Sequence, residues 1–124
     1  MGDYRKLEVW KLGCTFSDRV AAMVDALPPR VRKATGDQLS RAADAVHENI
    51  AEGRGLNTDR QLARHLRIAL GSANEVEDEL ATLNRRGHLR GEDQELMATA
   101  RSLCCMLAKF ISRVDPPDSA PSRR

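Results

Sequence analysis

A chain of 124 residues is long enough for one domain with a modest core. Its 20 basic and 18 acidic residues leave a formal net charge of only +2, so bulk charge alone does not indicate a nucleic-acid partner. One tryptophan, one tyrosine and two phenylalanines are too few for the base stacking by which single-stranded RNA is usually bound.

Neither a membrane protein nor a secreted one is predicted. The sequence has no run of about 18 apolar residues, and its N-terminus is not a charged segment followed by an apolar one. The cysteines are Cys14, Cys104 and Cys105, and their odd number and adjacent pair do not fit a disulfide framework. We therefore expect a reducing, cytoplasmic location.

A first helix is expected to begin after Asp3 and to end at Pro28-Pro29, because proline cannot continue a helix. Its apolar and small residues fall in two adjoining rows, a face wide enough to pack against more than one neighbour. The first row holds Trp10, Gly13, Ser17, Val20, Val24 and Leu27, and the second holds Val9, Leu12, Phe16 and Met23. Arg30, Arg32 and Lys33 follow, and we expect them to form a solvated loop.

A second helix is predicted from about Asp37 to Glu52, with Gly53 as its stop signal. The residues that share its apolar seam are Leu39, Ala43, Val46 and Ile50. Because only a short turn follows Gly53, this helix should lie antiparallel to the next one.

The third helix is the longest, from Thr58 to Arg86. Thr58 and Gln61 are three residues apart, as in a capping box, and Gly87 is expected to end the helix. Apolar residues recur at alternating spacings of four and three, which places them along one face. They are Leu62, Leu66, Ala69, Ala73, Val76, Leu80 and Leu83.

A fourth helix with the same spacing is predicted from about Glu92 to Val114. Its seam contains Leu96, Ala100, Leu103, Leu107, Phe110 and Val114. Asp115-Pro116-Pro117 should end it, and residues 115–124 are polar enough to form a disordered tail. The predicted fold is therefore all-α, an up-down-up-down antiparallel four-helix bundle over residues 1–114.

Three short motifs suggest a family. They are Leu7-Glu8-Val9-Trp10-Lys11, Asn49-Ile50-Ala51-Glu52-Gly53, and Ala69-Leu70-Gly71-Ser72-Ala73 with Glu75 following. In these motifs the chain resembles the four-helix bundle proteins of the intervening-sequence type, first noticed as reading frames inside insertions in 23S ribosomal RNA genes. The resemblance implies a homo-oligomeric ring, a pentamer in known relatives, with no enzymatic activity and no established molecular function.

The sequence departs from the family at one position, and its architecture is distantly similar to a second group of proteins. The family commonly has a proline two residues before the Asn-Ile-Ala-Glu-Gly run, where this chain has His47, so the kink that a proline gives is not expected to carry over. The architecture is also distantly similar to accessory proteins of diversity-generating retroelements, which bind nucleic acid and a reverse transcriptase.

Charged residues form two ridges of opposite sign. The acidic ridge on the second helix consists of Asp44, Glu48 and Glu52, and the basic ridge on the third consists of Arg60, Arg64 and Arg67. Like charges at this spacing repel, and the cations lie near a helix N-terminus, where the helix dipole disfavours them. One interpretation is that both ridges point outward and meet ligands or neighbouring subunits, and the other is that they are ordinary solvated faces.

The basic ridge also supports an alternative function. Arg54, Arg60, Arg64 and Arg67, together with Lys33, could face RNA phosphates, and a ring would multiply the patch. The near-neutral net charge and the scarcity of aromatic residues argue against this interpretation.

The fourth helix has a second apolar row and no charged back, which favours a subunit interface over a broad internal core face. The row consists of Met97, Cys104, Ala108 and Ile111, and the small outer residues are Ala98, Ser102 and Cys105. The predicted interface therefore comprises Met97, Cys104, Cys105, Ala108 and Ile111, joined by Asp44 and Glu48 of the acidic ridge.

The remaining motif residues are expected to be structural. Asn49 should fix the register of the second helix against the first. Glu52, at a helix C-terminus, needs a cationic partner. Gly71 and Ser72 should allow a neighbouring helix to approach closely.

Catalysis is not predicted, nor is a metal or other cofactor. Asp44 and His47 have only half of the spacing found in di-metal bundles, whose inward carboxylates come from all four helices. His65 and His88 have no acidic or cysteine companion at ligand spacing. The sequence thus favours a non-enzymatic, ring-forming scaffold, with an RNA-binding adaptor as the alternative.

Overall fold

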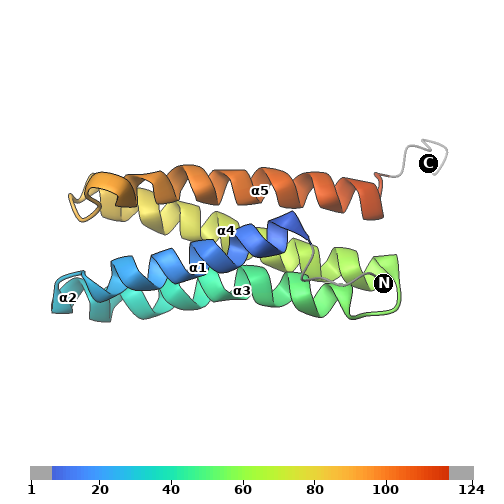
Figure 1. Cartoon of the computed structure of the whole chain (residues 1–124), viewed down its shortest axis with the longest axis horizontal. Helices are drawn as coiled ribbons and strands as arrows, with labels where there is room; N and C mark the ends of the chain where they lie inside the picture. Colours follow the sequence, from blue (N-terminus) through green and yellow to red (C-terminus); the bar gives the residue numbers. More distant parts are fainter. Residues whose placement is uncertain (1–6, 118–124) are drawn as a thin grey trace, which may run out of the picture.

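The computed structural model describes residues 7–117, which form four long helices joined by short connections (Figure 1). Helix α1 (Glu8–Asp25) leads through the single turn α2 (Pro29–Val31) and the π-helical turn η2 (Arg32–Gly36) into α3 (Asp37–Arg54). Helix α4 (Asp59–Arg85) follows, and the short 3₁₀ turn η3 (Gly91–Gln94) precedes α5 (Glu95–Val114).

The helices alternate in direction, and each long helix packs against two others. The neighbouring pairs are α1–α3, α3–α4, α4–α5 and α1–α5, which close the bundle around one core (Figure 1). The up-down-up-down antiparallel four-helix bundle is therefore confirmed. Within residues 7–117, no helix has both the length and the hydropathy needed to cross a membrane.

The apolar seams form the core, as the spacing predicts. All seven seam residues of α4 are buried, and so are the four of α3. On α5, the first five seam residues are buried, while Val114 at the helix end is only partly buried. Helix α1 buries residues from both of its rows, including Phe16 and Val20, so its wide face does contact two neighbours.

The ends of α4 follow local capping signals. The Gln61 backbone N–H donates to Thr58 Oγ1 at 3.1 Å, and the Thr58 hydroxyl donates to Gln61 Oε1. In a complete capping box the Gln61 side chain would instead accept a hydrogen bond from the Thr58 backbone N–H. At the other end Gly87 has φ +83°, and the N–H groups of Gly87 and His88 donate to Asn84 O and Leu83 O. These two bonds form a Schellman motif, so the predicted start and stop are confirmed.

The predicted loop after Pro28-Pro29 is wrong, because the chain is helical without interruption from Pro29 to Arg54. Pro29 occupies the first helical position, where its fixed φ starts a helix. Gly36 in the π-helical turn lies against α1, since a Cβ built there would be 2.8 Å from Val24 Cγ1. Contact with α1 therefore orders a segment whose charge suggested a loop.

The predicted stop at Gly53 is also wrong, since α3 continues to Arg54 and is capped by Gly55. Gly53 has a different role: an added Cβ would lie 3.0 Å from both His65 Cβ and Leu62 Cδ1 on α4. A glycine is needed here because the two helices approach closely, and not because the backbone turns.

Two other boundaries also differ from the prediction. Leu7 is extended and α1 begins at Glu8, while the residues before Leu7 lie outside the described part. Helix α5 begins at Glu95 after the 3₁₀ turn. Of the predicted tail, residues 115–117 are non-helical, and 118–124 lie outside the described residues.

Candidate interaction surfaces

A histidine at the α3–α4 boundary joins two of the motif residues. The Asn49 side-chain amide donates from Nδ2 to Ala45 O at 2.9 Å, and its Oδ1 lies 3.1 Å from His65 Nδ1. His65 Nε2 lies 4.0 Å from Glu52 Oε2, which supplies the partner expected for Glu52 whenever the imidazole is protonated. Asn49 thus fixes α3 against α4, and the expected register with α1 is wrong.

His65 is the residue that the sequence interpretation missed. Only 13% of its side chain is exposed, and its partners come from a different helix, where spacing along α4 cannot show them. One signal was available: His65 adjoins Leu66 and is three residues from Leu62, so it borders the buried seam. A polar residue there needs a partner on a neighbouring helix.

The acidic ridge does not point uniformly outward. The Ser17 hydroxyl of α1, which is buried, donates a hydrogen bond to Asp44, and Asp44 also lies 4.0 Å from His47 Nε2. Asp44 therefore links α1 to α3 while 51% of its side chain is exposed, so its predicted outward position is correct only in part. Of the three ridge residues, Glu48 alone is exposed without a side-chain partner among residues 7–117.

His47, which stands at the position of the family's proline, lies within the uninterrupted α3. It lies beside α1, since a Cβ built on Gly13 would be 3.3 Å from His47 Cβ. The small Gly13 therefore lets α1 approach α3 closely at His47.

The four predicted nucleic-acid-binding residues do not form one uniform patch. Arg60, Arg64 and Arg67 are exposed on the outer face of α4, whereas Arg54 at the end of α3 is partly buried, with an unbonded Nε. Arg67 forms a 2.7 Å ion pair with Asp115. Arg60 and Arg64 have no side-chain partner in the described part of the chain.

Other features of the same outer face are unusual for a solvated helix. Ile68 is 41% exposed, the one large hydrophobic residue among those described that is so exposed. A Cβ built on Gly71 would have nothing within 4 Å, so the neighbouring helix expected to approach Gly71 is not one of the described helices of this chain. Ser72 is partly buried and Glu75, which accepts a 2.9 Å hydrogen bond from Gln38, is exposed.

The predicted interface on α5 divides into two layers. Ile111 belongs to the core, with 9% exposure, and Met97 and Cys104 are partly buried. Cys105 and Ala108 are exposed. The small or uncharged exposed residues that follow the outer face of α5 are Ala98, Ser102, Cys105, Ala108 and Ser112. Lys109 is exposed on the same face, so the prediction that this helix has no charged back is wrong.

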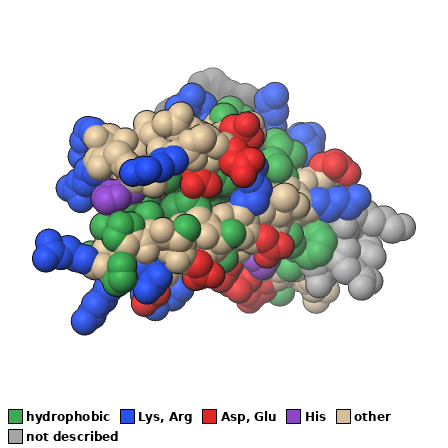
Figure 2. Space-filling model, turned by 60° about the vertical axis from the view of Figure 1, so that its left-hand side comes forward, with side chains coloured by type: hydrophobic (Ala, Val, Ile, Leu, Met, Phe, Trp, Pro, Cys, Tyr) green, Lys and Arg blue, Asp and Glu red, His purple; other side chains and the backbone are tan. Residues whose placement is uncertain are grey.

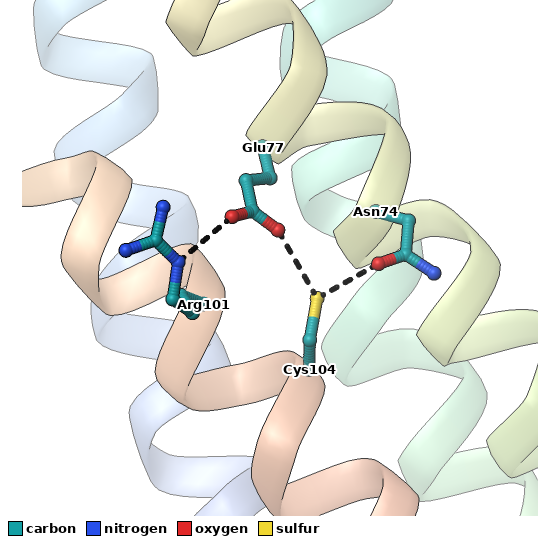
Figure 3. A network of polar contacts seen from close by, with 4 residues as sticks. All are labelled: Asn74, Glu77, Arg101 and Cys104. Atoms are coloured by element: carbon teal, nitrogen blue, oxygen red, sulfur yellow. Dashed lines mark hydrogen bonds and ion pairs between the residues drawn. The ribbon is translucent and has the colours of Figure 1, made fainter.

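Cys104 takes part in a polar network between α4 and α5 (Figure 3). Its Sγ donates to Asn74 Oδ1 at 3.2 Å and lies 3.9 Å from Glu77 Oε1, while Arg101 Nε lies 3.1 Å from Glu77 Oε2. Burial, followed by the Glu77 charge, raises the pKa of the Cys104 thiol to about 11. A thiol with this pKa is not an activated nucleophile, so the network is structural.

A groove lies where α2 and η2 meet the C-terminal part of α4. Its volume is about 400 Å³, and it is lined by residues that include Arg30, Arg86, His88 and Glu79. Basic side chains and a histidine project at this end of the bundle, toward the left of Figure 2. Glu79 Oε1 is buried without a hydrogen-bond partner, and burial followed by the Glu75 charge raises the pKa of the Glu79 carboxyl.

A metal site does not emerge from these surfaces. Within residues 7–117, no three His, Cys, Asp or Glu side chains lie together in a way that could hold a metal ion. Cys14, Cys104 and Cys105 are all free thiols.

The fold and these surfaces define a small helical bundle whose half-buried polar groups connect its own helices, and whose exposed helix faces are available to other molecules. The family model of the 23S rRNA-intervening sequence protein matches residues 5–109, and the chain belongs to that family. The family expected from the three motifs is therefore confirmed.

A solved structure agrees with this fold. It is the crystal structure of a protein of unknown function from the S23 ribosomal protein family of Bacteroides thetaiotaomicron. The two chains superpose with a TM-score of 0.73 at 21% identity, over 84% of this chain and 95% of that one. No curated protein matches the chain.

Proposed function

We propose that this chain is a non-enzymatic scaffold that assembles with copies of itself and offers its outer helix faces to partners. The observation that carries the proposal is the outer face of α5, where small uncharged side chains, with Lys109 as a cation among them, follow the helix and leave room for another backbone to approach. The partly buried polar groups, among them Asp44, Asn49 and Cys104, bond between helices of the chain, which supports structural roles for them.

The assembly that we propose is a closed ring, with five subunits as the family resemblance implies. In a ring, one surface of each subunit meets a different surface of the next. The outer face of α5 would be one of the two surfaces, and the exposed Glu48 belongs to a candidate for the other. The three free thiols fit a reducing cytoplasm, which is the location that we propose.

Native mass spectrometry over a range of protein concentrations tests the ring. Cys105→Arg would place a long cation in the middle of the proposed interface and should therefore break the ring. Because a head-to-tail ring needs at least three chains, only species of one or two chains should remain. Cys105 is exposed, so the fold should survive, whereas Ile111→Glu would place a charge in the core.

Thr15→Arg is the matched control, because it adds the same side chain at an exposed position of α1. It should leave the ring intact, and circular dichroism should show equal helix content in both variants. A wild-type chain that is monomeric at every concentration would contradict the scaffold.

Binding to RNA is the second candidate function. The observation in its favour is that Arg60 and Arg64 are exposed and have no side-chain partner among the described residues. If this function is correct, the protein purified without nuclease should carry RNA that is released as salt is raised. Glu75→Lys combined with Asp78→Lys should then strengthen RNA binding, because it extends the basic face along α4. Preparations free of RNA at low salt would contradict this function.

A further inference from the structure

Gly71 is a glycine that its own chain does not require. It lies in the interior of α4 (Asp59–Arg85), is exposed, and does not have the positive φ found at Gly87 and Gly91. Space for a side chain is open, since nothing lies within 4 Å of an added Cβ. Glycine is the least favourable helix residue apart from proline, so an external backbone that approaches closely is the remaining physical reason for it.

The charges on the outer face of α4 are arranged symmetrically about Gly71, with opposite signs on its two sides. Arg67 and Glu75 are each four residues from Gly71, and Arg64 and Asp78 are each seven residues away. At about 1.5 Å per residue, these distances along the helix are about 6 and 10.5 Å. All four residues are exposed.

This arrangement matches the same helix face turned end to end. When two copies of α4 lie antiparallel and cross at Gly71, the basic half of each copy faces the acidic half of the other. Both ends of the contact then bring opposite charges together, as an isologous two-fold contact requires. Gly71 is near the middle of α4, so the overlap covers most of the helix.

We propose that the outer face of α4 binds the same face of a second copy of the chain, antiparallel, across a two-fold axis at Gly71. The proposal rests on the self-association proposed above and adds a contact separate from the α5 face. Ile68, one turn before Gly71 and 41% exposed, would be covered in this contact. The absence of a Cβ at Gly71 lets the two backbones approach.

Contacts within the chain leave part of this charge unsatisfied. Arg67 pairs with Asp115, and Glu75 accepts a hydrogen bond from Gln38. Arg64 and Asp78 have no side-chain partner among residues 7–117, and they are the outermost charges of the symmetric set. An extended RNA phosphate backbone would fit the basic half of the face but would be repelled by the acidic half.

Charge reversal tests the contact, because two variants of opposite charge can be measured singly and then mixed. The acidic-face variant carries Arg64→Glu and Arg67→Glu, and the basic-face variant carries Glu75→Lys and Asp78→Lys. In a pair of rings joined through this contact, each variant alone places like charges at both ends of the contact, so the pair should separate into single rings and the number of chains should halve in native mass spectra. An equimolar mixture should restore the wild-type number, because the acidic face of one variant meets the basic face of the other.

A symmetric cross-link tests the position of the axis. In a background with the native cysteines changed to serine, Gly71→Cys should form a disulfide-linked dimer with oxidised glutathione, because helices packed at 8–10 Å bring the two Cα atoms within about 6 Å. The matched control is Arg60→Cys, also exposed on α4. In the antiparallel contact the two copies of position 60 would lie about 33 Å apart along the helix axis, so this variant should not cross-link.

The outcomes distinguish this contact from the scaffold as a whole. Variants that retain the wild-type number of chains, or a Gly71→Cys chain that does not cross-link more than Arg60→Cys, would overturn the α4 contact and leave the ring on α5 in place. A wild-type chain that is monomeric at every concentration would overturn both. Loss of RNA without a change in the number of chains, in the acidic-face variant, would favour the adaptor and overturn the α4 contact.

Discussion

The side chain of Asn49 on α3 fixes the hydrogen position on His65 of α4. Asn49 Nδ2 donates to Ala45 O at 2.9 Å, so its Oδ1 is the atom that lies 3.1 Å from His65 Nδ1. An amide oxygen only accepts, and His65 Nδ1 must therefore carry a hydrogen. The other ring nitrogen, Nε2, faces Glu52 at 4.0 Å. The Asn-Ile-Ala-Glu-Gly run is thus the part of α3 that positions α4.

Removing this amide should weaken the bundle. Asn49→Ala leaves Nδ1 of the largely buried His65 without its partner, and we expect the free energy of unfolding to fall by about 1–2 kcal/mol. Urea denaturation followed by circular dichroism, at a concentration where the wild type is monomeric, measures the change. Glu48→Ala, at the adjacent exposed position, should change it by less than about 0.5 kcal/mol. Equal effects of the two substitutions would show that the amide has no special role.

Two glycines should respond to alanine in opposite directions. Gly53→Ala places a Cβ 3.0 Å from His65 Cβ and from Leu62 Cδ1, so α3 and α4 must separate, at a cost of about 1–3 kcal/mol in the free energy of unfolding. Gly71→Ala meets nothing within 4 Å and should add up to about 1 kcal/mol through helix propensity.

Thermal denaturation of both glycine variants and the wild type, at a concentration where the wild type is monomeric, separates the two cases. The melting temperature should fall for Gly53→Ala and rise for Gly71→Ala. A rise for Gly53→Ala would mean that helix propensity, and not close packing, determines the effect at this position.

Local signals account for the parts of the fold that the sequence predicts well. The four apolar seams follow from helix geometry alone, because residues three and four apart share a face. The end of α4 is similarly local, since Gly87 supplies the left-handed residue and the Schellman bonds are made within a few residues of it.

Contacts between helices account for the differences. Gly53 resembles a helix stop in sequence, and only the position of Leu62 and His65 shows it to be a packing glycine. The spacing along α3 predicts that Asp44 points to solvent, and only the position of α1 shows that Ser17 donates a hydrogen bond to it. Partners of this kind depend on how two helices cross and rotate, which the spacing along one helix does not determine.

Glu77 should suppress the reactivity of Cys104. Burial and the Glu77 charge raise the pKa of the Cys104 thiol to about 11, so at pH 8 roughly a thousandth of it is thiolate. In a Cys14→Ser and Cys105→Ser background, iodoacetamide should alkylate Cys104 slowly, and Glu77→Gln should raise the rate several-fold by removing the adjacent charge. Mass spectrometry of timed samples gives both rates.

Asn74 provides a neutral comparison for this test. Asn74→Ala removes the other group that accepts a hydrogen bond from Cys104 without changing any charge, so it should raise the rate less than Glu77→Gln does. If Cys104 reacts as fast as a free thiol in the parent protein, or if Glu77→Gln leaves the rate unchanged, the Glu77 charge does not control this cysteine.

Glu79 should make the bundle less stable as its carboxyl ionises. Burial, then the charge of Glu75 and a hydrogen bond with it, raise the pKa of Glu79 above its usual 4.5. A raised pKa in the folded state means that the stability contributed by the protonated carboxyl is fully present below the unfolded pKa and is lost as pH rises through the folded pKa. Glu79→Gln removes this ionisation. The variant should therefore melt at a higher temperature than the wild type at pH 7, and the difference should disappear as pH falls below about 4.

The exposed Glu48 offers the control for this pH dependence, because Glu48→Gln neutralises a carboxylate on the same kind of helix surface without a buried oxygen. At a concentration where the wild type is monomeric, the melting temperature of Glu48→Gln should follow that of the wild type at both pH values. The two substitutions remove the same charge, so a parallel response would assign the effect to the net charge of the protein. A gain specific to Glu79→Gln at pH 7 would assign it to the cost of ionising a carboxyl whose Oε1 is buried without a partner.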